Sequence, residues 1–445
     1  MQRIKIPEGA RAIIEKLQNA GFEAYIVGGC VRDNVLGLSP HDWDICTSAM
    51  PETAIKLLEK YKIIPTGLKH GTVTVFPGDQ TDGYEVTTFR KDGEYKDNRH
   101  PESVEFVKSL REDLARRDFT INAMAYSDAT GIVDYFGGVE DLHNKRISCV
   151  GDPDERFRED ALRILRALRF SSTYGFSVSE KTADAIHRNG PLLANIAAER
   201  IQSELEKILV GQNVLSILLS YPDIFVQIIP ELGPCVGFSQ NNPYHVYTVY
   251  DHIAHAVANY EGTDLSVKVA LLLHDIGKPL CYSEDARGGH FYGHAVPGAD
   301  MTKEIVKRLK FDRKTQAEVE ELVLYHDSVI EPTPKTVKRW LNKIGEDQFR
   351  RLLEVKKADI LAHAKETQAD RLKRHEMLYC ILNDVIVESQ CFSLKDLDIS
   401  GNDIIALGFQ EGKIIGKILN SLLEKVINGE IKNKRDALIK EICNT

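Results

Sequence analysis

The sequence predicts an α+β fold, in which a small mixed sheet with helices is followed by an elongated, all-helical region. Short runs rich in β-branched and aromatic residues, typical of strands, are confined to residues 1–150. From residue 155 onward, apolar residues recur with helical spacing and strand candidates are almost absent. With 445 residues, the chain is also too long for one ordinary hydrophobic core.

The elements of the sheet follow a first helix. Residues 8–21 have the apolar spacing of an amphipathic helix that ends at Gly21. Four strands are then predicted, and a turn rich in Gly and Asp joins the last two. Their ranges are 24–27, 44–47, 72–76 and 84–89.

The helical region is interrupted once by residues that favour turns. Prolines, glycines and asparagines gather between residues 230 and 245, which is typical of a domain boundary. We expect four domains, which are a head, a helical neck, a second helical domain and a helical tail. Their predicted ranges are 1–150, 151–235, 236–370 and 371–445.

Composition narrows the class of protein. Hydrophobic residues make up 43% and charged residues 28%, as in a soluble globular protein, and no apolar run approaches the ~20 residues of a membrane-spanning helix. The N-terminus lacks the pattern of a secretory signal. Eight scattered cysteines without a C-x-x-C pair indicate reduced thiols and a cytoplasmic location. No protein partner is implied.

The net charge argues against general nucleic-acid binding but does not exclude binding at a local site. The formal net charge of −9 argues against indiscriminate nucleic-acid binding, which depends on neutralising phosphates. Arginines nevertheless gather between residues 116 and 169, and a local basic surface can still hold a nucleic acid.

Asp42 and Asp44 are candidate metal ligands. On a strand, residues two apart point to the same face, so both carboxylates can converge on one site. Mg²⁺ prefers oxygen ligands and often uses one or two carboxylates together with substrate phosphates. Such a pair alone is weak evidence, because it recurs by chance on exposed strands. Glu85, on a separate predicted strand, is either a third carboxylate of the site or an ordinary exposed residue.

The residues before this pair suit a phosphate. Gly28 and Gly29 follow a predicted strand, where the absence of side chains lets backbone N–H groups approach an anion. Arg32 can donate a fork of hydrogen bonds to phosphate oxygens. A simple turn and a surface ion pair are the alternative interpretations.

Four charged residues between 160 and 169 recur at every third position. On a helix Asp160, Arg163, Arg166 and Arg169 form a stripe along one side. This stripe is either a ladder of ion pairs facing solvent or a surface that reads a base. An Asp accepts hydrogen bonds and an Arg donates several, so together they can complement the base edges of C and A.

Several strings in this order resemble the class II tRNA nucleotidyltransferase and bacterial poly(A) polymerase family, within the DNA polymerase β-like superfamily. Ordered matches are far more specific than any single motif. The strings are Val27-Gly28-Gly29-x-Val31-Arg32-Asp33 with Asp42-x-Asp44, then 116–124 (RRDFTINAM), 134–142 (DYFGGVEDL), 158–170 (REDALRILRALRF) and 199–205.

The resemblance implies a DNA polymerase β-like head and a neck that binds RNA. It also implies magnesium-dependent, template-independent addition of C, C and A to the 3′ end of tRNA from CTP and ATP, releasing pyrophosphate. Asp42, Asp44 and Glu85 would be catalytic. Glu159, Asp160 and Arg163 would select the base as an amino-acid template. The remaining nucleotide-binding residues would be Gly29, Arg32, Arg117, Arg166 and Arg169.

Two closely related functions stay open. In the family, a loop corresponding to residues 89–101 is shortened in enzymes that add only C, and this sequence keeps it. Addition of A alone and poly(A) synthesis on the same scaffold remain alternatives. Of two different classes, an RNA-binding protein with an inactive head is disfavoured because the head carboxylates and the template residues are retained. The other, an HD-type phosphohydrolase whose head only binds nucleotide, does not account for the complete head motifs.

A second constellation lies in the helical region. Imidazole and carboxylate donors together suit a divalent transition metal. The sequence His274-Asp275-Ile276-Gly277 with flanking histidines resembles the HD phosphohydrolase superfamily, which implies a metal-holding HD domain over residues 236–370. It would hydrolyse a phosphoester, such as a 2′,3′-cyclic phosphate on damaged RNA, or serve as a scaffold. The implied ligands are His252, His274, Asp275, His294, His326 and Asp359.

Overall fold

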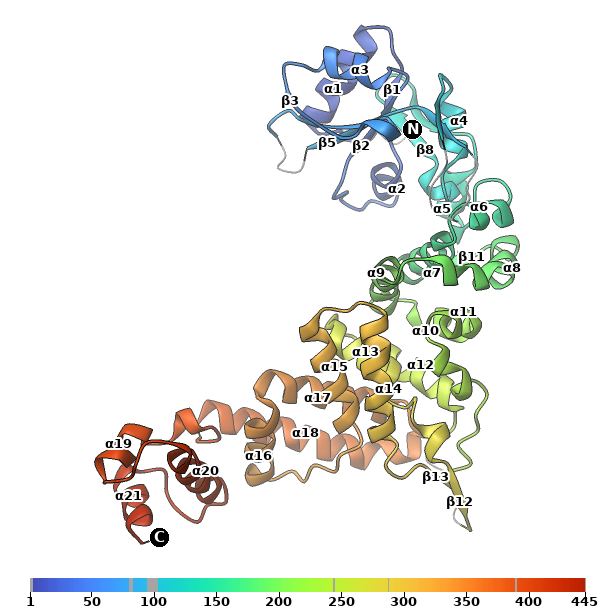
Figure 1. The fold of residues 1–445 in the computed structure, drawn as a ribbon. Helices are drawn as coiled ribbons and strands as arrows, with labels where there is room; N and C mark the ends of the chain where they lie inside the picture. The colour runs from blue at the N-terminus through green and yellow to red at the C-terminus, as the bar shows by residue number, and fades with distance from the viewer. Residues whose placement is uncertain are drawn as a thin grey trace. The chain divides into compact units, whose positions relative to one another are not determined.

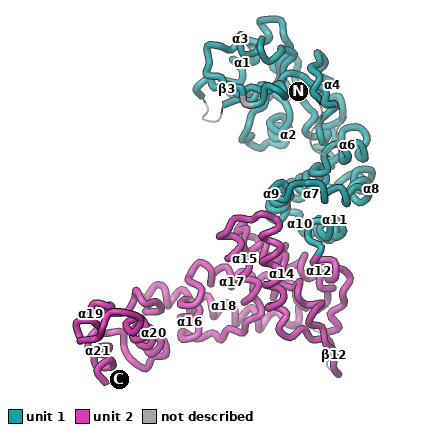
Figure 2. The backbone as a smooth tube through the Cα atoms, in the orientation of Figure 1, with its two compact units in different colours: residues 1–230 teal, residues 231–445 magenta. Residues whose placement is uncertain are grey.

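The computed structural model describes residues 3–79, 83–93, 103–242, 245–286, 288–388 and 390–444. The chain divides into two compact units, residues 1–230 and residues 231–445 (Figure 2). The described part of the first unit holds the predicted mixed sheet, and the described part of the second is largely helical (Figure 1). The predicted α+β fold class is therefore confirmed.

Seven strands form the sheet of the first unit in the order β3-β4-β5-β2-β1-β8-β9. Strand β2 runs parallel to β5, and the other neighbours are antiparallel. Three predicted strands have the expected bounds, and the fourth is one residue shorter. The strands are β1 (Ala24–Val27), β2 (Asp44–Thr47), β3 (Lys62–Gly67), β4 (Thr72–Phe76), β5 (Tyr84–Thr88), β8 (Met124–Ser127) and β9 (Gly131–Asp134).

Strands β3, β8 and β9 were not predicted, and the reasons are clear for β3 and β8. Strand β3 contains Pro65, which argues against a strand except at an edge, and β3 is an edge strand. In β8 all four residues are buried, so the alternation that marks a half-exposed strand is absent.

Helices of the first unit begin and end at residues whose backbone preferences explain the bounds. Helix α1 (Glu8–Asn19) starts after Pro7, and its Gly9 N–H donates to the Asp79 carboxylate at 2.8 Å. Beyond its C-terminal end, Gly21 has φ of +87°. The others are α2 (Gly29–Val35), α3 (Pro51–Leu57), α4 (Leu110–Ala115), α5 (Gly138–His143), α6 (Pro153–Glu159), α7 (Leu162–Tyr174), α8 (Glu180–Asn189), α9 (Ala198–Leu209), α10 (Val214–Ser220) and α11 (Pro222–Ile228).

One face of the sheet packs against α4. Buried Val27 of β1 and Cys46 of β2 contact Leu110 and Leu114 of that helix within one hydrophobic cluster. Short two-stranded ladders flank this core: β6 (Arg90–Asp92) with β7 (Val104–Phe106), and β10 (Arg146–Ile147) with β11 (Ser177–Val178).

The described part of the second unit consists of helices and one two-stranded ladder. Helix α13 (Leu265–Leu273) is buried from Ser266 to Leu273, as expected for a core helix. The other helices are α12 (Val249–Asn259), α14 (Ala295–Arg308), α15 (Arg313–Tyr325), α16 (Pro334–Ile344), α17 (Glu346–Leu361), α18 (Lys365–Val387), α19 (Gly401–Ala406), α20 (Lys413–Ile427) and α21 (Arg435–Cys443), and the ladder joins β12 (Ser283–Asp285) to β13 (Gly288–His290).

Helices α19 to α21 surround a hydrophobic cluster that includes Ile404, Leu423 and Leu438. Among the described residues, no helix has both the length and the apolar character needed to cross a bilayer.

Candidate active site and metal centre

The predicted carboxylates Asp42, Asp44 and Glu85 lie near the starts of the neighbouring strands β2 and β5. Strands β2 and β5 pair in parallel with Ile45 opposite Val86, so Asp44 and Glu85, each one residue earlier, lie on the same face of adjacent strands. Asp42 was expected on the strand, but β2 begins only at Asp44, so Asp42 lies in the exposed segment before it.

Negative charge accumulates at Asp44. Its side chain is half-buried, and burial raises the pKa of its carboxyl to about 6. The nearby Arg117 guanidinium lowers this pKa, whereas the charges of Glu85 and Asp42 raise it. Asp44, Glu85 and Asp42 together offer an all-oxygen donor set, which fits a hard divalent cation.

Arg117 lies between the glycine turn and these carboxylates. Gly28 has φ of +81°, a conformation that favours glycine, and a Cβ atom at this position would lie 2.9 Å from Arg117 Nη1. Burial alone would lower the pKa of Arg117, but the carboxylates of Asp113 and Asp44 raise it overall. The charged guanidinium therefore lies beside the turn, in space that a side chain at residue 28 would occupy.

Arg32 is held more firmly than its sequence context indicates. Its Nη1 donates to Asn122 Oδ1 at 2.6 Å, and its Nε donates to Asp33 Oδ1 at 2.9 Å. The guanidinium carbon also lies 5.2 Å from the ring centre of Phe170 and 5.1 Å from that of Tyr174, both on α7. Arg32 therefore connects α2 with α7.

The predicted charged stripe is interrupted at Asp160. Helix α6 ends at Glu159 and α7 begins at Leu162, so Asp160 lies between two helices, and the expectation of one continuous helix is wrong. Asp160 Oδ1 accepts a hydrogen bond from the Leu162 N–H at 3.1 Å, which satisfies a backbone donor at the start of α7. Its Oδ2 accepts from Arg200 Nη2 at 2.9 Å.

Glu159 and Arg163 meet at the same junction. Arg163 Nη1 donates to Glu159 Oε2 at 2.5 Å, and its Nη2 donates to the Arg116 carbonyl at 3.2 Å. Arg156 Nη2 approaches the other oxygen of Glu159 at 2.7 Å. The structure thus brings the three predicted template residues together at one helix junction.

Arg166 and Arg169 point to carboxylates that the sequence analysis did not select. Arg166 donates to Asp118 Oδ2 through Nε at 2.9 Å and Nη2 at 2.5 Å. Although burial opposes it, the Arg166 charge holds the pKa of Asp118 well below its usual range. Arg169 pairs with Glu204 at 3.2 Å. Asp118 directly follows Arg116 and Arg117 in the 116–124 motif, so the sequence could have indicated it. No local pattern indicates Glu204.

Three known protein families match parts of this chain. The family described as "Poly A polymerase head domain" matches residues 24–148. The family described as "Probable RNA and SrmB- binding site of polymerase A" matches residues 175–234, and "tRNA nucleotidyltransferase domain 2 putative" matches residues 297–442. The CCA-adding enzyme of Latilactobacillus sakei is 36% identical over 438 residues, covering 98% of both chains. The chain belongs to the CCA-adding enzyme family.

Other members of the CCA-adding family are also similar to this chain along nearly its whole length. The enzyme of Ligilactobacillus salivarius is 34% identical over 443 residues, which cover 97% of this chain and 95% of the relative. The crystal structure of the Bacillus stearothermophilus CCA-adding enzyme in complex with CTP has a TM-score of 0.71 and 29% identity, with 98% of each chain covered. The predicted family and its tRNA nucleotidyltransferase activity are confirmed, and this family implies a bound metal.

The second unit of this family member brings the other six predicted residues together. His252 lies on α12, and His274 and Asp275 directly follow α13. His294 precedes α14, His326 follows α15, and Asp359 lies on α17. All are buried except Asp359, whose side chain is 17% exposed.

Asp275 lies between two pairs of histidines. Its Oδ2 is 3.2 Å from His274 Nε2 and 3.4 Å from His252 Nε2. Its Oδ1 is 3.2 Å from His294 Nε2 and 3.6 Å from His326 Nε2. Two groups of three donors, each able to hold a metal ion, therefore share one carboxylate.

The hydrogen bonds of the four histidines orient their Nε2 atoms inward. Each Nδ1 lies 2.7–3.2 Å from a backbone carbonyl, which can only accept, so each Nδ1 donates. In a neutral ring the Nε2 atom is then a lone-pair acceptor. His294 Nε2 and His326 Nε2 lie only 3.0 Å apart, so a proton or a cation must separate their lone pairs. The donor set fits a divalent transition metal.

Other polar side chains surround this centre. Lys278 Nζ lies 2.7 Å from Asp275 Oδ2, and a cavity of about 240 Å³ in front of the centre is also lined by His363 and Arg371. His363 forms a third donor group with His252 and Asp359. His363 was not selected from the sequence, although it stands only four residues after Asp359, just beyond the end of α17.

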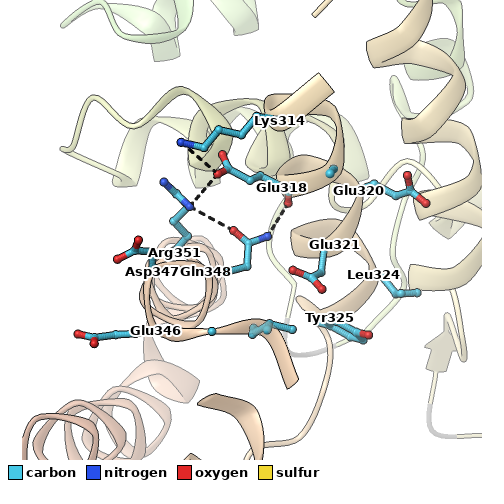
Figure 3. Close-up of a pocket in the computed structure, with 13 residues that line it drawn as sticks. Lys314, Glu318, Glu320, Glu321, Leu324, Tyr325, Glu346, Asp347, Gln348 and Arg351 are labelled. Atoms are coloured by element: carbon cyan, nitrogen blue, oxygen red, sulfur yellow. Dashed lines mark hydrogen bonds and ion pairs between the residues drawn. The ribbon is translucent and has the colours of Figure 1, made fainter. Parts of the chain in front are cut away.

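A cavity elsewhere in the second unit contains none of the predicted site residues. It has a volume of about 650 Å³ and lies between α15 and α17 (Figure 3). Its Glu318 accepts from Arg351 Nη1 at 3.1 Å, and Gln348 donates to the Glu318 carbonyl at 2.9 Å. These side chains bind one another across the cavity.

Proposed function

We propose that the first unit adds C, C and A to the 3′ end of tRNA from CTP and ATP, releasing pyrophosphate, with the head carboxylates and the helix junction acting as one site. One observation carries this proposal. Arg116 accepts from Arg163 through its carbonyl, while the next residue, Arg117, lies beside Gly28 and Asp44. A single dipeptide therefore joins the carboxylates to the junction of Glu159, Asp160 and Arg163.

The carboxylates Asp42, Asp44 and Glu85 would hold magnesium, because they offer only oxygen donors and their charges oppose one another. When bound, magnesium supports attack of the RNA 3′-hydroxyl on the α-phosphate and neutralises charge on the leaving pyrophosphate. The backbone of Gly28 and Gly29 together with Arg117 would bind the triphosphate.

Base selection follows from the hydrogen-bonding groups at the helix junction. Cytosine and adenine each present an exocyclic amino donor beside a ring nitrogen acceptor, whereas uracil and guanine present the reverse order. The Asp160 carboxylate would accept from the amino group, and the Arg163 guanidinium would donate to the ring nitrogen. Arg32, Arg166 and Arg169 would contact the nucleotide, each oriented by a bond to another side chain.

The relatives support this choice of substrates. The Bacillus stearothermophilus enzyme was crystallised with CTP and shares 29% of its residues with this chain along nearly its whole length. The loop proposed to distinguish complete from CC-only addition includes residues 94–101, which lie outside the described residues.

One experiment tests the proposal and its near alternatives. Transcripts of tRNA ending at the discriminator base, after CC or after CCA are incubated with each nucleotide and Mg²⁺. We expect the shortest tRNA to accept CTP and then ATP, and extension to stop at CCA. Extension of the CC-ending tRNA alone would indicate A addition only, and unlimited addition of A would indicate a poly(A) polymerase.

A second activity, metal-dependent hydrolysis of a phosphoester, is proposed for the second unit. It is supported by Asp275 between two histidine pairs, with the cations of Lys278 and Arg371 lining the same cavity. Purified protein is assayed with adenosine 2′,3′-cyclic phosphate and adenosine 3′-phosphate in Mn²⁺ or Ni²⁺. Absence of both hydrolysis and bound transition metal would favour a scaffold.

We also propose a domain organisation and a location for the chain. The head, neck, HD and tail would occupy residues 1–150, 151–235, 236–370 and 371–445, and the chain would act in the cytoplasm. Limited proteolysis followed by mass spectrometry would test the boundaries, and fractionation of cells would test the location.

A further inference from the structure

A second cavity adjoins the cavity in front of the metal centre. It has a volume of about 350 Å³, compared with about 240 Å³ for the first. The two share four lining residues, which are His326, Asp327, Asp359 and Arg371. The two cavities therefore adjoin at these residues, and Arg371 lines both of them.

Helix α18 provides one wall of the second cavity. Its four lining residues, Arg371, Arg374, His375 and Leu378, are spaced i, i+3, i+4 and i+7, so they lie on one face of the helix. Two guanidinium groups are thus aligned along the wall, starting at the point where the two cavities meet. Successive charges at this spacing suit an anion that carries more than one phosphate.

Neither guanidinium is committed to a strong partner. Arg371 Nη2 lies 3.6 Å from Asp359 Oδ2, longer than a hydrogen bond, and its side chain is 40% exposed. Arg374 pairs with Glu331 at 2.9 Å, but both side chains are more than half exposed, and such pairs contribute little to stability. Both arginines can therefore turn toward a phosphate.

We propose that the second unit acts on the phosphorylated end of a nucleotide chain rather than on a mononucleotide, with Arg371 and Arg374 binding the phosphate that joins the last two nucleotides. This inference rests on the proposed phosphohydrolase function. The terminal phosphate lies at the metal centre beside Lys278, and the rest of the chain leaves along α18. Val329 and Ile330, which also line the second cavity, offer apolar contacts to a base.

The first test compares adenosine 3′-phosphate and 5′-phosphate with adenylyl dinucleotides that carry a phosphate at the 3′ or 5′ end. Hydrolysis by the metal-loaded full chain is measured as kcat/KM for phosphate release. We expect a roughly tenfold preference for one dinucleotide over its mononucleotide, because an added charge-assisted contact is made. The preferred dinucleotide identifies which end of the chain is read. Equal values for both pairs would overturn the inference.

Arg374→Gln is expected to abolish most of this preference. Lys373→Gln is the matched control, because Lys373 is exposed on the same helix and does not line the cavity. A preference that persists in Arg374→Gln, or that falls equally in Lys373→Gln, would contradict a subsite at Arg374.

A binding measurement separates this inference from the hydrolase proposal. Fluorescent dinucleotides are titrated into the full chain in EDTA at several salt concentrations. Each phosphate neutralised on a single strand adds about 0.7 to the slope of log K against log salt. We expect this slope to fall in Arg374→Gln and not in Lys373→Gln. If no probe is hydrolysed, the hydrolase proposal fails, but a slope that depends on Arg374 still supports the chain-binding groove. An unchanged slope would overturn the groove.

Discussion

Arg200 of α9 holds the carboxylate of Asp160 from outside the α6–α7 junction, with Nη2 2.9 Å from Oδ2 and Nη1 3.4 Å from Oδ1. This pair fixes the plane of the carboxylate that we propose accepts from the incoming base. Replacing Arg200 leaves Asp160 present and bound to the Leu162 N–H but no longer fixed from the second side, so the effect should fall on base selectivity and not on the chemical step.

Arg200→Gln should raise the incorporation of UTP and GTP relative to CTP and ATP by roughly tenfold, since one charge-assisted orienting contact is lost. Single-nucleotide extension of tRNA measures the ratio of kcat/KM values. Arg188→Gln is the control, because its ion pair with Asp154 is at the surface, where Arg188 is 57% exposed. Unchanged selectivity in Arg200→Gln would contradict the orienting role.

Asp44→Asn should reduce nucleotide incorporation by more than about 100-fold, because even residues that only support a metal ligand commonly contribute 10- to 100-fold. Asn keeps the shape of Asp and removes one charge. Asp128→Asn, at a surface pair with Arg11, is the control. Incorporation within a few-fold of the wild-type value would exclude Asp44 as a metal ligand.

The same side chain predicts a dependence of stability on pH. Burial raises the pKa of Asp44 to about 6, above its value of about 3.9 in an unfolded chain. The folded state therefore binds more protons between these values, and stability conferred by this group rises as pH falls from 6 toward 4. In EDTA, the Tm difference between Asp44→Asn and the wild type should shrink over that range. A constant difference would contradict the raised pKa.

The purified chain should contain about two transition-metal ions, because two groups of three donors share Asp275. His326→Ala should lose one ion, and Asp275→Ala should lose both. Elemental analysis by mass spectrometry gives the stoichiometry. His187→Ala, in the first unit, is the control. A wild-type chain without transition metal would refute the centre.

Arg32→Lys should lower the free energy of unfolding by about 1–2 kcal/mol, because lysine cannot reproduce the fork to Asn122 and Asp33 together with the stacking on Phe170. Urea denaturation followed by tyrosine fluorescence and circular dichroism measures the change. Arg11→Lys, at an exposed pair, should be nearly neutral. Equal midpoints for both variants would show that Arg32 does not stabilise the contact between α2 and α7.

Local patterns in the sequence were sufficient for much of the fold. Strands β1, β2 and β4 were predicted with their observed bounds, because short β-branched runs lie between turn residues. The break at Asp160 could not be predicted in this way, since neither Asp160 nor Ala161 is a glycine or proline. It depends on Asp160 binding both the Leu162 N–H and Arg200, which is 40 residues away in the sequence.

Candidate residues were easier to predict than their partners. Ordered motifs indicated Arg166 and Asp275, but not that Arg166 would bind Asp118 or that Asp275 would lie between two histidine pairs. Those relationships arise when separate helices pack, and spacing along the chain carries no information about them. The orientation of His252 also depends on a distant part of the chain, because its Nδ1 donates to the Ala362 carbonyl.

Asp160 connects base preference with helix stability. The carboxylate proposed to read the base also satisfies the first N–H of α7, and loss of such a bond commonly costs about 1 kcal/mol. A substitution that alters which nucleotide is accepted therefore also weakens the start of the helix that carries Arg163, Arg166 and Arg169. Asn can retain the bond to Leu162 but not the charge paired with Arg200. Engineering a new base preference into this scaffold will consequently require a second, compensating change that restores the start of α7.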